Sequence, residues 1–428
     1  MLFRKYGTSL ISFVTGSKRE FTDVVYLFAL QGINQLVPLF VMPYLIIVLG
    51  TKEYGYLGFA QSVIQYFILL IDFGFNLSAT QRIAISLGNK TEISRIFFAT
   101  LYAKLILLVI SVLLFIIMLC FVPVFHVYMT ALLLTFPMVL GNTFTFTWLF
   151  QGLGKIRYIA IINTVSKFLI LPLTFFLVKT PDDYPVAALI QSSVFVLVAV
   201  ISVYFVSKWQ LITYVRCAWN DIKTEIKESF PLFLSTASIS MYTQLFIVIL
   251  GFLVTPEIVG KYAAAERIMR ALCFVFYIPV SQAFFPKLSH LVTVDRTKAV
   301  KLFKKILILV AGIMTILWGV LFLGNGILVR FLGPDYQGMS LLFRIFAFAP
   351  LAIGLGGIFG QMGLVALGNY ASKQKFQKAY MIAAAISLIL VSSLAPSGAA
   401  IGAAVALVAT EYTVFGLMMY YYYRSKIC

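Results

Sequence analysis

Charged residues are scarce in this sequence of 428 residues, where they make up 11% of the chain. An ordinary soluble protein has about 25% charged residues and about 45–50% apolar ones. Here hydrophobic residues make up 61%, so a soluble fold would have to expose large apolar side chains to water. The composition excludes a soluble protein of two or three domains and indicates a protein embedded in a lipid bilayer.

Histidine and cysteine are also rare, with two and four residues respectively. His126 and His290 lie far apart in the chain, so no metal site is predicted. The cysteines form no CxxC pair and are best interpreted as small apolar residues of the spans. No Walker A pattern, Ser/His/Asp set or pair of catalytic carboxylates is present. We therefore expect neither an enzyme nor an ATP-driven pump, and no cofactor other than a coupling H⁺ or Na⁺.

Long apolar stretches are abundant and predict the fold class directly. A helix needs about 20 apolar residues to cross about 30 Å of hydrocarbon. Such stretches predict an all-α integral membrane protein with about twelve transmembrane helices. They lie near residues 24–49, 54–78, 97–122, 127–150, 157–178, 185–206, 229–254, 258–285, 304–332, 338–366, 377–395 and 399–423.

The few charges are unevenly distributed, with 33 Lys and Arg against 15 Asp and Glu. A basic chain is sometimes a nucleic-acid-binding protein, so the positions of the charges matter. The tails and alternate loops of one face hold 24 of the basic residues, and the loops of the other face hold four. The positive-inside rule then places both termini in the cytoplasm. Membrane lipids are expected partners, and nucleic acid is not.

Two segments of the chain resemble each other. Thr51, Glu53 and Gly55 match Thr255, Glu257 and Gly260 with a one-residue gap. A second match relates residues 137–141 to 350–354, at a separation only 8–9 residues greater. The repeat predicts a six-helix half over residues 1–207, a cytoplasmic linker over 208–228 and a second half over 229–428. An even number of spans makes the halves parallel, around a central cavity, which is a transporter plan.

Charged residues inside the spans are candidates for function, because burying them in hydrocarbon is costly. The basic ones outnumber the acidic ones, which favours an anionic ligand. The candidate cavity cations are Lys104, Lys167, Arg267, Arg270 and Arg344, and the acidic candidates for ion coupling are Glu411, Glu266 and Asp72.

Other interpretations of these charges remain open. Glu266 and Arg270 have the i,i+4 spacing of a pair on one helix face. Asp72 and Arg344 lie near span ends, from which a side chain can reach the interface. Lys167, about 15 Å into its span, is too deep for that.

Four Gln and Asn residues on the first two predicted spans are polar candidates for the cavity wall. Hydrogen bonds between helices explain their presence equally well. The four residues are Gln31, Asn34, Gln61 and Gln65.

Several motifs resemble those of a known family. Segments 31–34, 49–55 and 150–155, together with the duplicated plan, are similar to the Wzx-type oligosaccharide flippases. These form the polysaccharide transporter branch of the multidrug/oligosaccharidyl-lipid/polysaccharide exporter superfamily. The resemblance implies flipping of an undecaprenyl-diphosphate-linked repeat unit during O-antigen or related lipopolysaccharide and surface polysaccharide biosynthesis. It also implies a location in the bacterial inner membrane and alternating access driven by an ion gradient, as in an antiporter. A polysaccharide polymerase and a chain-length regulator are the partners that it suggests.

The residues agree with this implication. We expect Arg267, Arg270 and Lys167 to hold the diphosphate or an acidic sugar, while Glu411 or Glu266 titrates during the cycle. Two alternatives remain: a cation-coupled multidrug exporter, whose cationic drugs favour an acidic cavity, and a membrane polysaccharide polymerase or glycosyltransferase, which needs a large loop or catalytic segment.

Overall fold

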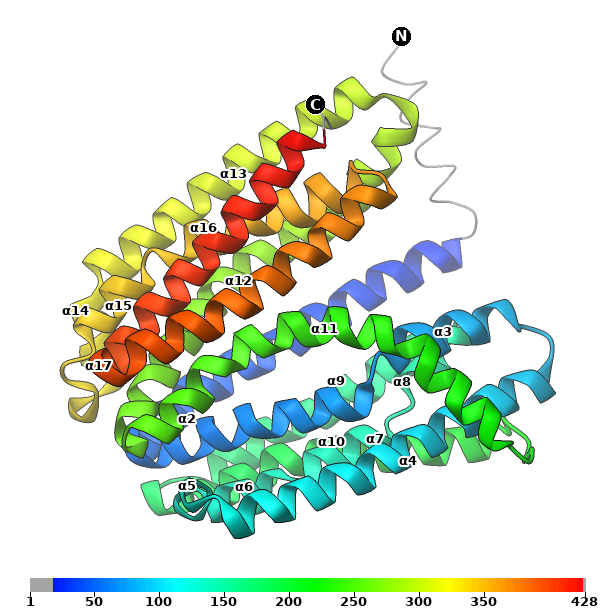
Figure 1. Cartoon of the computed structure of the whole chain (residues 1–428), viewed down its shortest axis with the longest axis horizontal. Helices are drawn as coiled ribbons and strands as arrows, with labels where there is room; N and C mark the ends of the chain where they lie inside the picture. Colours follow the sequence, from blue (N-terminus) through cyan, green and yellow to red (C-terminus); the bar gives the residue numbers. More distant parts are fainter. Residues whose placement is uncertain (1–17, 426–428) are drawn as a thin grey trace.

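The computed structural model describes the backbone of residues 18–425, and the side chains of residues 40–425 apart from Ile156, Ser235 and Met241. This part of the chain is helical and contains no strand, as the apolar stretches predict (Figure 1). The helices up to residue 208 are α2 (Lys18–Asp72), α3 (Phe75–Ile85), α4 (Lys90–Phe121), α5 (Pro123–Val127), α6 (Met129–Thr135), α7 (Pro137–Phe144), α8 (Thr147–Gly152), α9 (Ile156–Leu177), a 3₁₀ turn at Pro181–Asp183, and α10 (Tyr184–Lys208).

The later helices begin after an extended connection. They are α11 (Trp219–Leu253), α12 (Pro256–Val294), α13 (Arg296–Leu323), α14 (Asn325–Leu332), a 3₁₀ turn at Pro334–Tyr336, α15 (Ser340–Phe346), α16 (Ala349–Gly357), a π-helical stretch at Ile358–Ala366, and α17 (Tyr370–Arg424).

The two longest helices, α2 and α17, are each interrupted by a sharp turn. Gly50 has φ 71° and ψ −175° inside α2, and Ala399 has φ 47° and ψ −129° inside α17. Each helix therefore consists of two arms that run back along one another (Figure 1). These turns lie where the sequence predicts one span to end and the next to begin.

Nine helical stretches of the described chain are long and apolar enough to cross a membrane. The multi-span all-α fold is thus confirmed, while the count of twelve stays a prediction. Two predicted spans are broken in the structure. Pro137 begins α7, and Pro350 lies in the first turn of α16. Proline has no N–H to continue a helix but fits its first turn, which explains both breaks.

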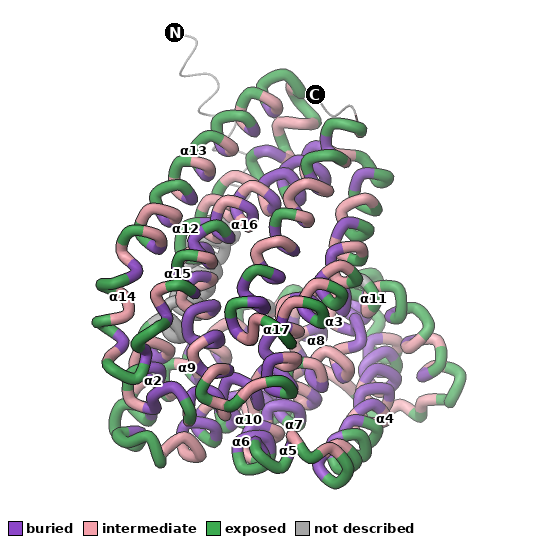
Figure 2. The backbone as a smooth tube through the Cα atoms, turned by 60° about the vertical axis from the view of Figure 1, so that its left-hand side comes forward, coloured by how far each residue is buried: buried purple, intermediate pink, exposed green. Residues whose placement is uncertain are grey.

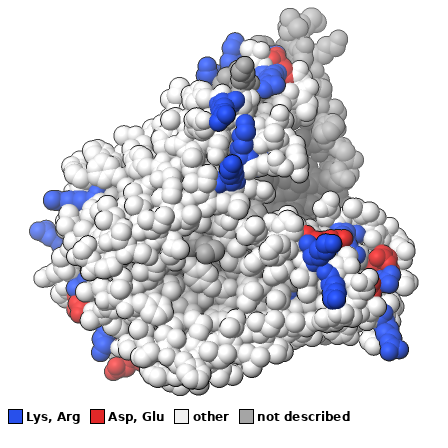
Figure 3. Space-filling view, in the orientation of Figure 1, with Lys and Arg blue, Asp and Glu red and all other residues white. Residues whose placement is uncertain are grey.

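The outer surface has the character of a membrane protein. Apolar side chains such as Val109 on α4 and Ile308 on α13 are exposed, and exposed positions follow the outward faces of these helices (Figure 2). Figure 3 shows a broad uncharged belt, with Lys, Arg, Asp and Glu gathered toward the ends of the molecule. Such a belt is too large for a face in contact with water, so the chain is a multi-pass membrane protein.

The buried core shows how the helices are grouped. One cluster of buried apolar residues comes only from residues 79–206 and another only from residues 277–422. A larger cluster includes residues from both parts of the chain and joins the two groups. The groups lie close together at one end of the molecule and diverge toward the end where α2 begins and α17 finishes (Figure 1).

Two glycines lie at a very close approach between the groups. A Cβ atom on Gly55 of α2 would lie 1.9 Å from the carbonyl oxygen of Pro256, and one on Gly260 of α12 would lie 1.7 Å from that of Thr51. Neither position has room for a side chain. The contact is reciprocal and joins the matched glycines of the repeat, as expected where two copies meet about a two-fold axis. The division at residues 207 and 229 stays a prediction.

The first part of α11 packs against the N-terminal group. Arg82 of α3 forms an ion pair with Glu225, and its guanidinium also lies 3.4 Å from Glu228. Gly74 fits closely against the backbone at Ser229 and Phe233, and Phe73 stacks on Phe233 at 4.5 Å between ring centroids. Farther along, Tyr242 of α11 stacks on Tyr380 of α17 at 6.0 Å. Helix α11 therefore contacts both groups.

Glu225 predicts a pH dependence of stability. It is fully buried and one of its carboxylate oxygens has no partner. Burial raises the pKa of Glu225 to about 7, although Arg82 opposes the shift. The folded protein then binds a proton that the unfolded chain releases above its ordinary pKa. The stabilising contribution is present below pH 4.5 and is lost as the pH rises through about 7.

We expect the melting temperature of the purified protein to depend less steeply on pH between 5 and 8 in Glu225→Gln than in the parent chain. The substitution removes the titrating group while preserving its shape. Glu257→Gln is the control, because Glu257 is half exposed. Parallel pH curves for Glu225→Gln and the parent would contradict the assignment.

Candidate functional site

A cavity of about 350 Å³ lies where the two groups of helices meet. Its volume falls in the range of small-molecule sites. Thirteen residues line it: Val41, Met42, Leu45, Tyr54, Leu57, Gln61, Met138, Lys167, Ile170, Gln191, Val194, Phe195 and Arg267. All but Arg267 come from residues 41–195, so the N-terminal group forms the wall and α12 contributes a single side chain.

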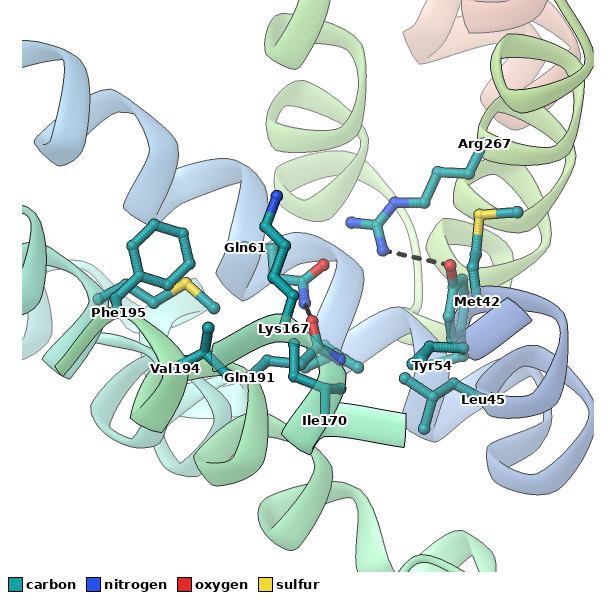
Figure 4. Close-up of a pocket in the computed structure, with 13 residues that line it drawn as sticks. Met42, Leu45, Tyr54, Gln61, Lys167, Ile170, Gln191, Val194, Phe195 and Arg267 are labelled. Carbon is teal, nitrogen blue, oxygen red and sulfur yellow. Dashed lines mark hydrogen bonds between the residues drawn. The ribbon is translucent and has the colours of Figure 1, made fainter. Parts of the chain in front are cut away.

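The charges of the cavity wall are all positive. Lys167 of α9 and Arg267 of α12 line it, and no carboxylate is among the lining residues that the structure describes. Both side chains extend into the space between the helices (Figure 4). Among the described residues, no acid pairs with either cation. The site therefore offers two cations from different parts of the chain to an anion.

Polar uncharged groups complete the wall. The Gln61 amide of α2 donates a hydrogen bond to the Gln191 side chain of α10, beside Lys167 (Figure 4). This pair holds the two helices together, yet each amide keeps donor or acceptor positions that the bond does not use. Hydroxyl-bearing ligands would find hydrogen-bond partners here.

Arg267 is held by an aromatic residue of the other group. One of its Nη atoms donates a hydrogen bond of 3.2 Å to the Tyr54 hydroxyl, and the guanidinium carbon lies 5.5 Å from the centroid of the Tyr54 ring. Figure 4 shows this contact at one side of the cavity. A cation bound to a neutral phenol keeps its full charge for a ligand.

Lys104 does not line the cavity. It is 1% exposed, and its Nζ lies 3.3 Å from Asp72 and 3.3 Å from the carbonyl oxygen of Asn142. The Asn142 amide also donates to Asp72 at 2.8 Å. This cluster neutralises Lys104 within the N-terminal group, so it is unsuited to the role of a cavity cation. Asp72, expected to reach the membrane interface from its span end, is instead the ion-pair partner of Lys104.

Arg270 lies in a second buried cluster, away from the cavity wall. Its Nε lies 2.8 Å from Glu266, at i,i+4 spacing, and Nη1 lies 3.4 Å from Glu411 of α17. The helical pair predicted as one interpretation is therefore present. One oxygen of Glu266 and one nitrogen of Arg270 have no hydrogen-bond partner. With two acids for one base, the cluster has a formal charge of −1.

The remaining candidates are dispersed. Arg344 is exposed and lines an apolar groove on the outer surface between α13, α15 and α17. Gln65 is exposed and does not line the cavity. The side chains of Gln31 and Asn34 lie outside the described residues. The structure thus brings Lys167, Arg267 and Gln61 together and adds Tyr54 and Gln191.

An uncharged belt, helical spans and an internal cationic cavity together define a multi-pass membrane transporter. Comparison with protein families gives a more specific result. Residues 21–292 match the family described as polysaccharide biosynthesis protein. The chain is also 33% identical over 409 residues to the "Putative O-antigen transporter" of Escherichia coli (strain K12), covering 95% of this chain and 97% of that protein.

The chain belongs to the polysaccharide biosynthesis protein family. The resemblance seen in the motifs is therefore confirmed, and the chain is a transmembrane transporter of the polysaccharide branch, not an enzyme.

Solved structures share the fold. A lipid II flippase, MurJ, in an inward closed conformation superposes with a TM-score of 0.71 and 15% identity, covering 92% of this chain and 87% of that one. A multidrug resistance MATE family transporter of the MOP superfamily, in an inward-facing conformation, superposes with a TM-score of 0.69 and 15% identity. The match covers 92% of this chain and 94% of that one. At this identity the likeness concerns the fold.

The different surroundings of the two lysines predict opposite effects on stability. Lys104→Met would leave Asp72 without its cation, and we expect the free energy of unfolding to fall by about 2–4 kcal/mol. Lys167→Met removes a cation that has no acidic partner in the described part of the chain, so stability should be unchanged or higher. Thermal unfolding of the detergent-purified variants measures both effects.

The double variant Asp72→Asn/Lys104→Met serves as the control. Removing both charges should restore most of the stability that Lys104→Met loses. A double variant as unstable as the single one would show that the ion pair is not the cause.

Proposed function

We propose that this protein flips undecaprenyl-diphosphate-linked oligosaccharide units across the bacterial inner membrane for O-antigen or related surface polysaccharide biosynthesis. The observation that carries the proposal is the cavity with two cations, Lys167 and Arg267, and no carboxylate on its wall. Family membership supports the polysaccharide class of the cargo, and the name of the relative supports O-antigen.

The cavity addresses the hardest step of this transport. A diphosphate loses its hydration when it enters hydrocarbon, and transfer of a bare charge is costly. Arginine binds phosphate oxygens with two parallel hydrogen bonds, while lysine supplies a compact charge. Lys167 and Arg267 would replace the lost water, and Gln61 and Gln191 would contact sugar hydroxyls. A multidrug exporter for cationic drugs fits poorly, because an all-cationic wall repels its cargo.

Charge removal tests the cargo site. We expect Lys167→Ala and Arg267→Ala each to lower surface polysaccharide at least about tenfold, since each removes a charge-assisted contact to phosphate. The amount of protein in the membrane should stay normal. Reconstituted vesicles with a labelled undecaprenyl-diphosphate oligosaccharide give the direct rate.

Arg344→Ala is the matched control, because it removes a span arginine that lies outside the cavity. It should retain transport. Wild-type polymer levels in both cavity variants, with normal membrane insertion, would contradict the assignment.

We further propose that the cluster of Glu266, Arg270 and Glu411 couples transport to an ion gradient. Its net charge of −1 is buried, and one Glu266 oxygen has no partner. An unbalanced buried charge is unfavourable, so a proton or Na⁺ would neutralise it. Glu266 and Arg267 are neighbours on α12, so the occupancy of this cluster and the position of the cavity cation depend on the same helix.

Glu411→Gln should leave Arg270 paired with Glu266 and make the cluster neutral without an ion. We expect the dependence of flipping rate on the H⁺ or Na⁺ gradient to disappear, while binding of the lipid-linked sugar remains. Glu257→Gln, an exposed acid on the same helix as Glu266, should keep that dependence. An unchanged response to both gradients in Glu411→Gln would exclude the cluster from coupling.

We propose that the end of the molecule where the two groups diverge faces the cytoplasm, which places both termini there. Helix α2 begins and α17 ends there (Figure 1), and the sequence concentrates its Lys and Arg in the loops of the same face. The cavity then faces inward, and the Gly55–Gly260 contact closes its periplasmic side. Rocking of the two six-helix halves, 1–207 and 229–428, joined by 208–228, would expose it to the other side.

A further inference from the structure

The contact between Tyr54 and Arg267 lies at the closed end of the cavity. Tyr54 directly precedes Gly55, which fits against the backbone of α12 at Pro256 and Gly260. One turn deeper, a Cβ on Gly58 would lie 3.2 Å from the Cβ of Ala263. Tyr54 and Ala263 are 1% and 0% exposed. The second arm of α2 and the start of α12 therefore form a closely packed layer at this end of the cavity, which we call the roof.

Arg267 belongs to both the roof and the cavity. Its Cα lies two turns below Gly260, and side chains on a helix lean toward its N-terminus, which brings the guanidinium back to Tyr54. The same guanidinium lines the cavity opposite Lys167. Because α12 supplies only this one lining residue, the two cations face one space only while α2 and α12 stay together.

We infer that the two-cation site is assembled only while the roof is closed, and that Tyr54 is the positioning residue that holds Arg267 in it. Parting of α2 and α12 at the glycine contact separates Tyr54 from Arg267. It also moves Arg267 with α12, away from Lys167 on the N-terminal group. The affinity for a diphosphate therefore falls as the roof opens. This inference rests on the proposed function for the identity of the anion.

Thermodynamic linkage gives the reverse effect. If opening weakens anion binding, then anion binding stabilises the closed roof by the same factor. A bound diphosphate alone would keep the roof shut, and opening would need the ion-binding cluster on the same helix α12. The roof thus makes release of the cargo dependent on the coupling ion.

The test labels the roof with a thiol reagent. Ala263→Cys is placed in a chain whose four native cysteines are replaced, and a membrane-impermeant maleimide is added from the side opposite the termini. Labelling should be slow in this parent. Tyr54→Leu, which removes the ring and the hydrogen bond, should raise the rate about tenfold, and Tyr54→Phe, which retains the ring, should raise it less.

Inorganic diphosphate then tests the linkage without any lipid or sugar. It should slow labelling of the parent but not of its Lys167→Ala or Arg267→Ala derivatives. The effect should also be lost in Tyr54→Leu. If Tyr54 had a merely structural role, Tyr54→Leu would yield less folded protein, and diphosphate would still slow the labelling of that variant. Equal labelling rates in the parent and Tyr54→Leu, or no protection by diphosphate, would overturn the inference.

A cross-link gives a second, independent measurement. The 3.2 Å separation between the Cβ positions of Gly58 and Ala263 is close to the usual 3.5–4.5 Å or so of a disulfide. Oxidised Gly58→Cys/Ala263→Cys should stop flipping, and a reductant should restore it, while each single variant is insensitive. Undiminished flipping by the cross-linked protein would show that the roof does not move. Roof labelling requires no cargo, so failure to flip undecaprenyl-linked sugars would reject the proposed function alone.

Discussion

The free-energy cost of an unpaired charge in hydrocarbon determines how the buried charges of this molecule are arranged. Acids neutralise two of the span bases: Asp72 pairs with Lys104, while Glu266 and Glu411 surround Arg270. Lys167 and Arg267 have no acidic partner among the described residues and line the cavity between the two groups. Pairing thus separates charges that maintain the fold from charges left for a ligand. The same rule underlies the cation site proposed at the C-terminal cluster, which has an extra carboxylate.

Helix α12 connects these separate charge sites. Glu266 and Arg270 face the C-terminal group, whereas Arg267 lies between them in sequence and reaches the cavity and Tyr54. Its first turns pack against α2 so closely that only glycine fits at position 260. One helix therefore carries the cavity arginine, the roof contact and two members of the ionic cluster. A displacement of α12 alters all three together, as the proposed coupling requires.

Much of the architecture could be predicted from the sequence, because the bilayer imposes simple rules. Apolar length indicates the spans, and the repeat anticipates that Gly55 and Gly260 are equivalent. The i,i+4 spacing along one helix was sufficient to predict the Glu266–Arg270 ion pair. The sequence could not separate Lys104 from Lys167, since Asp72 lies 32 residues away and meets Lys104 only after packing. Tyr54 and Gln191 were missed as site residues because ordinary aromatic and amide side chains give no signal without their partners.

Helix α11 has a consequence for how the halves can move. Its residues up to Phe233 pack on the N-terminal group, while Tyr242 stacks on α17. Near its end, Phe252 packs on Phe59 and Phe125 of the N-terminal group again. A change in the angle between the two groups therefore strains α11 itself, because both of its ends pack on the N-terminal group while Tyr242 between them stacks on α17. The segment between Phe233 and Tyr242 is one place where this strain falls. There Thr236 and Ser238 donate hydrogen bonds to the carbonyl oxygens of Leu232 and Leu234, a pattern that loosens and bends helices. A few hydroxyl groups thus allow a continuous helix to bend at this segment without being broken.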